Sequence, residues 1–194
     1  MSRRVGVFRR LAALYDRMQR EYDAAAAPLG FTCAGCPQNC CTSFFQHHTY
    51  VEWAYLWKGL DELPAERRDA FLGRARDYLD AARAALDRGE TPAAMCPLNE
   101  AGRCALYSHR LMICRLHGVP HVLQAPGRAR QAYPGCWRHG ELAADRPDAP
   151  VLDRTPLYRE LAALERDFLG PQAGRLPRAD LTLAEMLVQG PPGL

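Results

Sequence analysis

The chain has 194 residues, which is the length of one domain and enough to bury a hydrophobic core without stabilising cross-links. Hydrophobic residues make up 48% of it and charged residues 24%, as in ordinary soluble proteins, and the formal net charge is only +3. Since the basic residues are spread along the chain and form no tract, we expect neither a nucleic-acid-binding nor a membrane-binding surface.

The N-terminal segment does not have the features of a secretory signal. Arg9 and Arg10 interrupt its apolar residues, and no apolar stretch elsewhere approaches the length of a transmembrane helix. We therefore expect a cytoplasmic protein, in which thiols stay reduced. In that compartment clustered cysteines indicate a metal-binding or catalytic site, and disulfide bonds are the less favoured alternative.

The first predicted element is an amphipathic helix over residues 3–27, which Pro28 and Gly30 end. Its apolar residues recur at intervals of three and four, so they form one stripe along the helix. The expected members of this stripe are Val5, Phe8, Leu11, Ala12, Tyr15, Met18 and Tyr22.

Two further helices are expected between the cysteine-containing segments. Thr49 and Glu52 have the spacing of a capping box, which predicts a helix that begins there. Pro64 fits the first turn of a longer helix that runs to about Arg88, and Gly89 is its stop signal.

The second half of the chain has weaker patterns. Residues 108–115 predict a short helix, and residues 121–133 predict a small hairpin around the turn Pro126–Gly127. Thr155–Pro156 begins a helix that extends to about Leu169. A capping box at Thr182–Glu185 begins a last short helix that Gly190 ends.

These elements divide the chain into three segments. We expect an N-terminal helix over 1–30, a cysteine-cluster metal-binding domain over 31–141 that includes helices 49–88, and a C-terminal helical extension over 142–194, all packed as a single compact unit. The predicted fold class is therefore mainly α, with helices flanking a loop-rich centre that cysteines line and with one small β-hairpin.

The eight cysteines fall into two groups in the sequence. Several thiolates that converge on one point repel each other unless a cation or a covalent bond joins them, so clustered cysteines indicate either metal or disulfides. We expect the two groups to meet in space, where Gly102 predicts a turn that folds Cys96 back toward Cys104. The members are Cys33, Cys36, Cys40 and Cys41 in the first group, and Cys96, Cys104, Cys114 and Cys136 in the second.

Spacing within the first group is informative. Cys33 and Cys36 are separated by two residues, which lets a tight turn direct both sulfurs at one ion. Cys40 and Cys41 are adjacent, and neighbouring side chains diverge in a strand or a helix, so this pair does not easily bind one tetrahedral ion. The pair would serve two ions or different irons of a cluster, or one member is a spare thiol and a candidate nucleophile or redox group.

Two cysteines of the second group each precede a histidine by three residues. The pairs are Cys114 with His117 and Cys136 with His139. A Cys-x-x-His pair can chelate a metal as Cys-x-x-Cys does, with imidazole in place of one thiolate. Alternatively these histidines lie near the site and hydrogen-bond to sulfur. The sequence leaves both alternatives open, as it does for the histidines at 47–48.

The number of cysteines does not identify the metal. Four thiolates around one Zn²⁺ make a closed structural site, and four around iron hold an iron–sulfur cluster. Eight sulfurs suffice for two four-coordinate sites, for one multinuclear site, or for one site together with reactive thiols. We therefore expect an iron–sulfur cluster or Zn²⁺, and spacing alone does not choose between them.

The cysteines also lie in a set of local motifs between about residues 33 and 136: Cys33-x-x-Cys36-x-x-x-Cys40-Cys41, Cys96-Pro-Leu, Gly102-Arg-Cys104, Tyr107, Arg110 and Cys114-Arg115. This set resembles the bacterial CxxCxxCC cysteine-cluster family (the YkgJ type), which is described as a zinc- or iron-chelating domain. The resemblance implies a metal site that uses the first seven cysteines, with Cys136 at the position of a later cysteine in many members. The chain departs from the family at Leu111, where proline is usual, and at His117, where an aromatic residue is common.

Three functions are consistent with these patterns. The first is a metal-binding protein that holds an iron–sulfur cluster or zinc through its clustered cysteines, with a structural, sensing or redox role. The alternative is a metal-dependent enzyme that uses the centre and a spare thiol for redox or modification chemistry. The third is a zinc-built interaction module. Arg110 and Arg115 flank Cys114, where they would lower its thiol pKa or form salt bridges within the loops.

Overall fold

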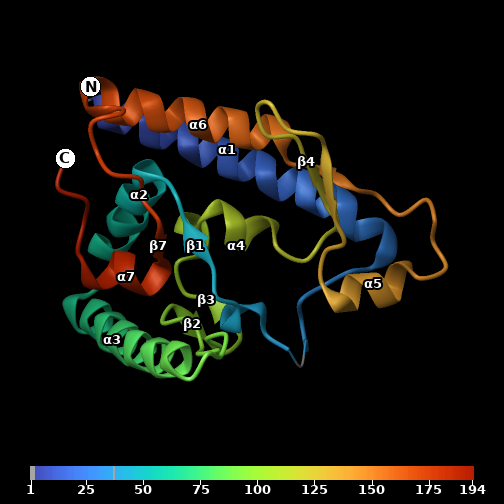
Figure 1. Ribbon diagram of the computed structural model, residues 1–194, viewed down its shortest axis with the longest axis horizontal. Helices are drawn as coiled ribbons and strands as arrows, with labels where there is room; N and C mark the ends of the chain where they lie inside the picture. The colour runs from blue at the N-terminus through green and yellow to red at the C-terminus, as the bar shows by residue number, and fades with distance from the viewer. Residues whose placement is uncertain (1–2, 37) are drawn as a thin grey trace. The chain divides into compact units, whose positions relative to one another are not determined.

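We describe a computed structural model of the protein, in which residues 3–36 and 38–194 are placed (Figure 1). The fold is mainly helical with small sheets, as the sequence predicts. Contacts group the chain into two compact units: Met1–Pro37 with Met112–Leu164 form the first unit, and Gln38–Leu111 with Glu165–Leu194 form the second. Each unit joins segments that are distant in the sequence. Its boundaries therefore differ from those of the segments 1–30, 31–141 and 142–194, and that division stays a prediction.

The first unit is built on α1 (Arg3–Ala26), which packs against α4 (Met112–Leu116) and lies beside α6 (Thr155–Leu169) (Figure 1). The predicted start and end of α1 are confirmed, since a short turn at Ala27–Leu29 and Gly30 follow it. The predicted stripe is wrong at Val5, which is 51% exposed, because the helix turns a neighbouring set of residues inward. The buried residues of this core include Val7, Leu11, Leu14, Tyr15, Met18, Met112, Leu116, Leu157, Leu161 and Leu164.

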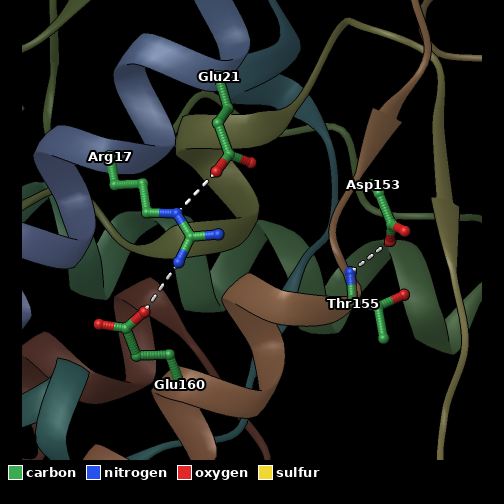
Figure 2. Close-up of polar contacts among 5 residues, drawn as sticks. All are labelled: Arg17, Glu21, Asp153, Thr155 and Glu160. Carbon is green, nitrogen blue, oxygen red and sulfur yellow. Dashed lines mark hydrogen bonds and ion pairs between the residues drawn. The ribbon is translucent and has the colours of Figure 1, made fainter.

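Polar contacts connect α1 with α6 and fix where α6 begins (Figure 2). The guanidinium of Arg17 donates to Glu21 at 2.7 Å and to Glu160 at 3.2 Å. The Asp153 carboxylate accepts from the backbone N–H of Thr155 at 2.9 Å, which caps the first turn. The predicted start of α6 at Thr155 is confirmed.

The predicted hairpin is confirmed in the first unit. β4 (His121–Leu123) pairs antiparallel with β5 (Gln131–Tyr133), and His121 lies opposite Tyr133. A third strand, β6 (Leu152–Asp153), pairs in parallel with β4 and was not predicted, because two residues carry no periodicity. The helix α5 (Trp137–Ala143) also lies where the sequence indicates little helical pattern.

The second unit is built on α2 (Tyr50–Asp61), α3 (Ala65–Asp87) and α7 (Leu183–Val188). The indole N–H groups of Trp53 and Trp57 both donate to the carbonyl of Met186, at 3.0 and 2.8 Å, so they fix α7 against α2. The core also contains Leu56, Leu60, Phe71, Ala75, Tyr78, Ala82, Leu98, Leu106, Leu111, Leu183, Ala184 and Leu187.

Short elements complete the second unit. β1 (Gln46–His47) pairs with β7 (Leu181–Thr182), and β2 (Asn99–Glu100) pairs with β3 (Arg103–Cys104). The predicted capping box of α7 is confirmed, since Thr182 and Glu185 bond to each other's backbone N–H. The helix predicted over 108–115 forms in two pieces, a turn at Tyr107–His109 in the second unit and α4 in the first.

The capping box predicted for α2 is wrong. Thr49 is the N-cap residue, but its hydroxyl donates to the Glu52 carboxylate at 2.7 Å and caps no backbone group. The N–H groups of Tyr50 and Val51 donate to the two carboxylate oxygens of Glu165, at 2.9 and 2.8 Å. Burial raises the pKa of Glu165, and these two hydrogen bonds oppose that shift. A carboxylate from a distant segment thus satisfies two donors that a helix start leaves open.

We expect Glu165→Ala to lower the free energy of unfolding by about 1 to 2 kcal/mol, because the first turn of α2 loses its acceptor. The control is Glu160→Ala on the same helix, which removes only the exposed ion pair with Arg17 and should cost less than about 0.5 kcal/mol. Urea unfolding of both variants measures the difference. Equal midpoints for the two variants would contradict this account of the α2 cap.

Candidate metal centre

The eight cysteines divide equally between the two units. Each unit takes two cysteines from each of the two sequence groups. None of the eight is in a disulfide bond, so no disulfide competes with metal binding among them. The first unit holds Cys33, Cys36, Cys114 and Cys136, and the second unit holds Cys40, Cys41, Cys96 and Cys104.

In the second unit, a 3-10 turn at Cys40–Thr42 presents the adjacent pair. The Asn39 side chain accepts from the backbone N–H of Cys41 at 2.9 Å and so caps this turn. A hydrogen bond from the Cys40 thiol reaches the Cys41 sulfur. From the sequence we expected these neighbouring side chains to diverge, whereas this hydrogen bond joins their sulfurs.

The other two cysteines of this unit reach the same place through backbone pairing. The N–H of Cys96 donates to the carbonyl of Cys41 at 2.9 Å, and the N–H of Asn99 donates to the carbonyl of Cys96 at 2.9 Å. The β2–β3 pairing then places Cys104 opposite Asn99. Gly102 has a φ of 83°, so the predicted turn between Cys96 and Cys104 is confirmed.

Burial and local charge separate the thiols of the second unit. A hydrogen bond from Cys40 lowers the pKa of Cys41 to about 6, helped by Asn99 and by the positive charge of Arg110, while burial opposes the shift. Burial raises the pKa of Cys96 to about 12, and the neighbouring Cys41 and Cys104 add to that shift. Cys96 can therefore ionise near neutral pH only if a cation compensates its charge.

Hydrogen-bond donors and a positive charge that the sequence did not predict lie near these sulfurs. Asn99 Nδ2 is buried and donates to no oxygen or nitrogen atom. The Asn99 amide instead acts as an N–H donor to the Cys41 sulfur and lowers the pKa of that thiol. Arg74 donates to the carbonyl of Pro97 at 2.9 Å and opposes the rise in the pKa of Cys96. Such donors stabilise thiolates, so the buried Asn99 amide and the thiol set fit a bound metal. An asparagine beside cysteines is the only sequence signal that could have indicated Asn99.

The two arginines that flank Cys114 in the sequence contact aromatic rings, and an effect of either on the Cys114 pKa stays a prediction. The charge of Arg110 acts on Cys41, and its guanidinium lies over the Tyr107 ring at 5.1 Å. Arg115 is buried in the first unit with its guanidinium 4.0 Å from the centre of the Tyr15 ring. Its charge is therefore engaged with an aromatic face of the core.

In the first unit, Cys33 and Cys36 form a turn in which the N–H of Cys36 donates to the carbonyl of Cys33 at 3.2 Å. Cys136 is the N-cap residue of α5, and Cys114 lies in α4. His139, three residues after Cys136, is 2% exposed and its Nε2 has no hydrogen-bond partner. Burial lowers the pKa of His139, so the neutral ring that a metal or a thiol would need is favoured.

The other candidate histidines differ in their surroundings. His47 is 2% exposed in β1, and its Nδ1 is buried without a partner. His48 Nδ1 lies 3.2 Å from the Asp180 carboxylate on the surface. His117 is half-buried in the loop after α4. Within residues 3–36 and 38–194, no three His, Cys, Asp or Glu side chains already surround a point where they could hold an ion.

Comparison with known proteins gives no relative. No family model, no curated protein and no solved structure matches this chain. The resemblance to the CxxCxxCC family therefore stays a prediction that rests on the motifs. Over the part of the chain that is described, no helix is both long enough and apolar enough to cross a membrane.

Gly135 allows the segment before Cys136 to approach the segment after α4. Its φ is 79°, and a Cβ there would lie 2.6 Å from the carbonyl oxygen of Gly118. We expect Gly135→Ala to destabilise the fold by at least about 2 kcal/mol more than Gly127→Ala. Gly127 is the matched control because its φ is 70° but nothing lies within 4 Å of its Cβ position. Thermal unfolding measures both, and similar losses would contradict the close approach.

The buried His47 should make stability depend on pH. Burial lowers its pKa from 6.5 to about 4, and the charge of neighbouring His48 adds to the shift. The unfolded chain therefore binds the proton more tightly, so the stability present above pH 6.5 is lost as the pH falls toward 4. The loss reaches roughly 3 kcal/mol.

Urea unfolding across this pH range measures the loss. His47→Gln should flatten the dependence, because glutamine does not titrate. The control His48→Gln changes an exposed neighbour and should leave the slope nearly as it is. A slope unchanged in His47→Gln would refute the assignment.

Proposed function

We propose that this protein is a metal-binding protein that holds an iron–sulfur cluster or zinc through its cysteines, in a structural, sensing or redox role. The observation that supports it most directly is the set of four thiols in the second unit. The turn of Cys40 and Cys41 is hydrogen-bonded to Cys96, which lies three residues before the β2–β3 hairpin that carries Cys104. No described disulfide engages any of them.

The chemistry of these donors favours a thiophilic metal. Thiolates bind zinc and iron in preference to the harder calcium and magnesium ions, which take oxygen ligands. Cys96 and Cys104 pack against the hydrophobic core, so a metal there would be shielded on one side. Burial keeps Cys96 protonated, the neighbouring Cys41 and Cys104 add to this effect, and a bound cation would compensate the charge of the Cys96 thiolate.

A metal at this position would stabilise the fold because it would cross-link two segments that are distant in the sequence. It would join the turn at Cys40–Thr42 to the β2–β3 hairpin, and the segment between them contains α2 and α3. We propose that the loop side chains reorient to bind, since binding at loop-built sites is coupled to folding. The proposal includes a reducing, cytoplasmic location. An enzymatic use of the centre stays a prediction.

The adjacent pair bears on the identity of the metal. In an iron–sulfur cluster Cys40 and Cys41 could bind different irons. A single tetrahedral zinc ion would have to take both adjacent sulfurs as ligands, or would leave one of the two thiols unbound. Metal analysis with an optical spectrum of protein purified without oxygen separates the two. Visible sulfur-to-iron absorption identifies a cluster, and a colourless protein with stoichiometric zinc identifies zinc. Protein that holds neither metal, after reconstitution with Zn²⁺ alone and after reconstitution with iron and sulfide, would refute the proposal.

Removal of the metal should also destabilise the protein. A site loaded at about 100 times its Kd contributes about 2.7 kcal/mol, which corresponds to a fall in Tm of roughly 5 to 10 °C on chelation. Cys104→Ser should bind less metal and lose less Tm on chelation than the parent protein. The matched control Ser43→Ala should keep the full effect. A Tm that chelators leave unchanged in metal-loaded protein would exclude a structural role.

A further inference from the structure

The first unit contains four cysteines that the centre of the second unit does not use. They come from three segments that are distant in the sequence: the turn at Cys33–Cys36, the helix α4 with Cys114, and the start of α5 with Cys136. All three segments belong to this one unit, and none of the four thiols forms a disulfide.

Hydrogen bonds join the three segments next to the cysteines themselves. The guanidinium of Arg138 donates to the carbonyl of Ala34 at 3.1 Å, which ties the Cys33–Cys36 turn to α5. The N–H of Cys136 donates to the carbonyl of Gly118 at 2.9 Å, which ties the start of α5 to the loop that follows α4. Each tie lies within four residues of a cysteine on either side.

Two glycines show how closely these segments approach. A Cβ at Gly118 would lie 3.2 Å from the Phe31 ring, two residues before Cys33. A Cβ at Gly135 would lie 2.6 Å from the carbonyl oxygen of Gly118. The backbone is therefore packed tightly at the place where the turn, the loop after α4 and the start of α5 meet.

A buried ring nitrogen provides a second, independent indication of a ligand. His139 packs edge-on against Phe31 with ring centres 5.3 Å apart, so it lies between α5 and the segment that leads to Cys33. It is 2% exposed, and its Nε2 has no partner within the structure. A buried polar atom without a partner costs free energy unless a ligand satisfies it.

We propose that the first unit holds a second metal centre, separate from the centre of the second unit, in which the side chains of Cys33, Cys36, Cys114 and Cys136 reorient from positions that do not yet surround a common point and bind zinc or iron. His139 is a positioning residue that hydrogen-bonds to a metal-bound sulfur through Nε2. The inference rests on the proposed function for its metal chemistry. It divides the eight cysteines into two four-thiolate sites, and each site lies within one unit.

The test compares metal content per chain and native mass spectra of the anaerobically purified protein with those of five variants, after reconstitution with Zn²⁺ alone or with iron and sulfide. Cys136→Ser should retain half of the parent's metal, Cys104→Ser the other half, and the double variant almost none. Trp137→Phe changes the exposed neighbour of Cys136 and should keep all of it. Cys33→Ser, at an exposed turn, repeats the first test if Cys136→Ser fails to fold.

The outcomes separate this inference from the proposed function. Full metal content in both Cys136→Ser and Cys33→Ser would overturn the second centre and leave the first in place. Loss of all metal in either folded single variant would show one joint site and overturn the division. A parent protein that binds no metal would overturn both proposals.

His139→Gln tests the positioning role. This variant should still bind metal at the second centre. Its sulfur-to-metal absorption should shift relative to the parent protein, or it should release metal to a chelator about tenfold faster. An unchanged spectrum together with an unchanged release rate would refute that role.

Discussion

The burial of a thiol beside other thiols is the constraint that governs the cysteine-bearing region of the second unit. In the second unit, the backbone of Cys96 is bonded to that of Cys41, and Cys104 lies on the paired strand, so the fold holds these groups near each other. Burial keeps Cys96 protonated, while the hydrogen bond from Cys40 favours the thiolate of Cys41. A cation bound there would relieve this conflict, because a positive charge stabilises a neighbouring thiolate.

The interleaved path of the chain gives the cysteines their grouping. The first unit takes the turn with Cys33 from the N-terminal part of the chain and Cys136 from the segment that follows α4 in the sequence. The second unit takes residues 38–111 and the C-terminal residues 165–194. Adjacent turns of the sequence, at residues 33–36 and 40–42, consequently belong to different units. The same interleaving explains why Glu165, near the C-terminal end of α6, caps the start of α2.

Local signals predicted most of the helices well. The boundaries of α1, α3 and α6 follow from proline, glycine and apolar spacing, which act within a few residues. The sequence did not predict α5, because its first turn is Trp137-Arg-His-Gly and no apolar stripe marks it. Of the candidate sites, the cysteines were identifiable from their clustering. Asn99 and the tie from Arg138 to Ala34 were not, since single polar residues have no distinctive spacing.

By itself, the sequence determined that this chain is mainly helical and that its eight thiols fall into two groups along the chain. It also determined the turn that returns Cys96 toward Cys104, because that turn needs only Gly102 and its neighbours. Only the tertiary structure decided which cysteines share a compact unit and that Cys40 hydrogen-bonds to Cys41. Those relations depend on hydrogen bonds between segments far apart in the chain and on burial, and neither leaves a pattern in the local sequence.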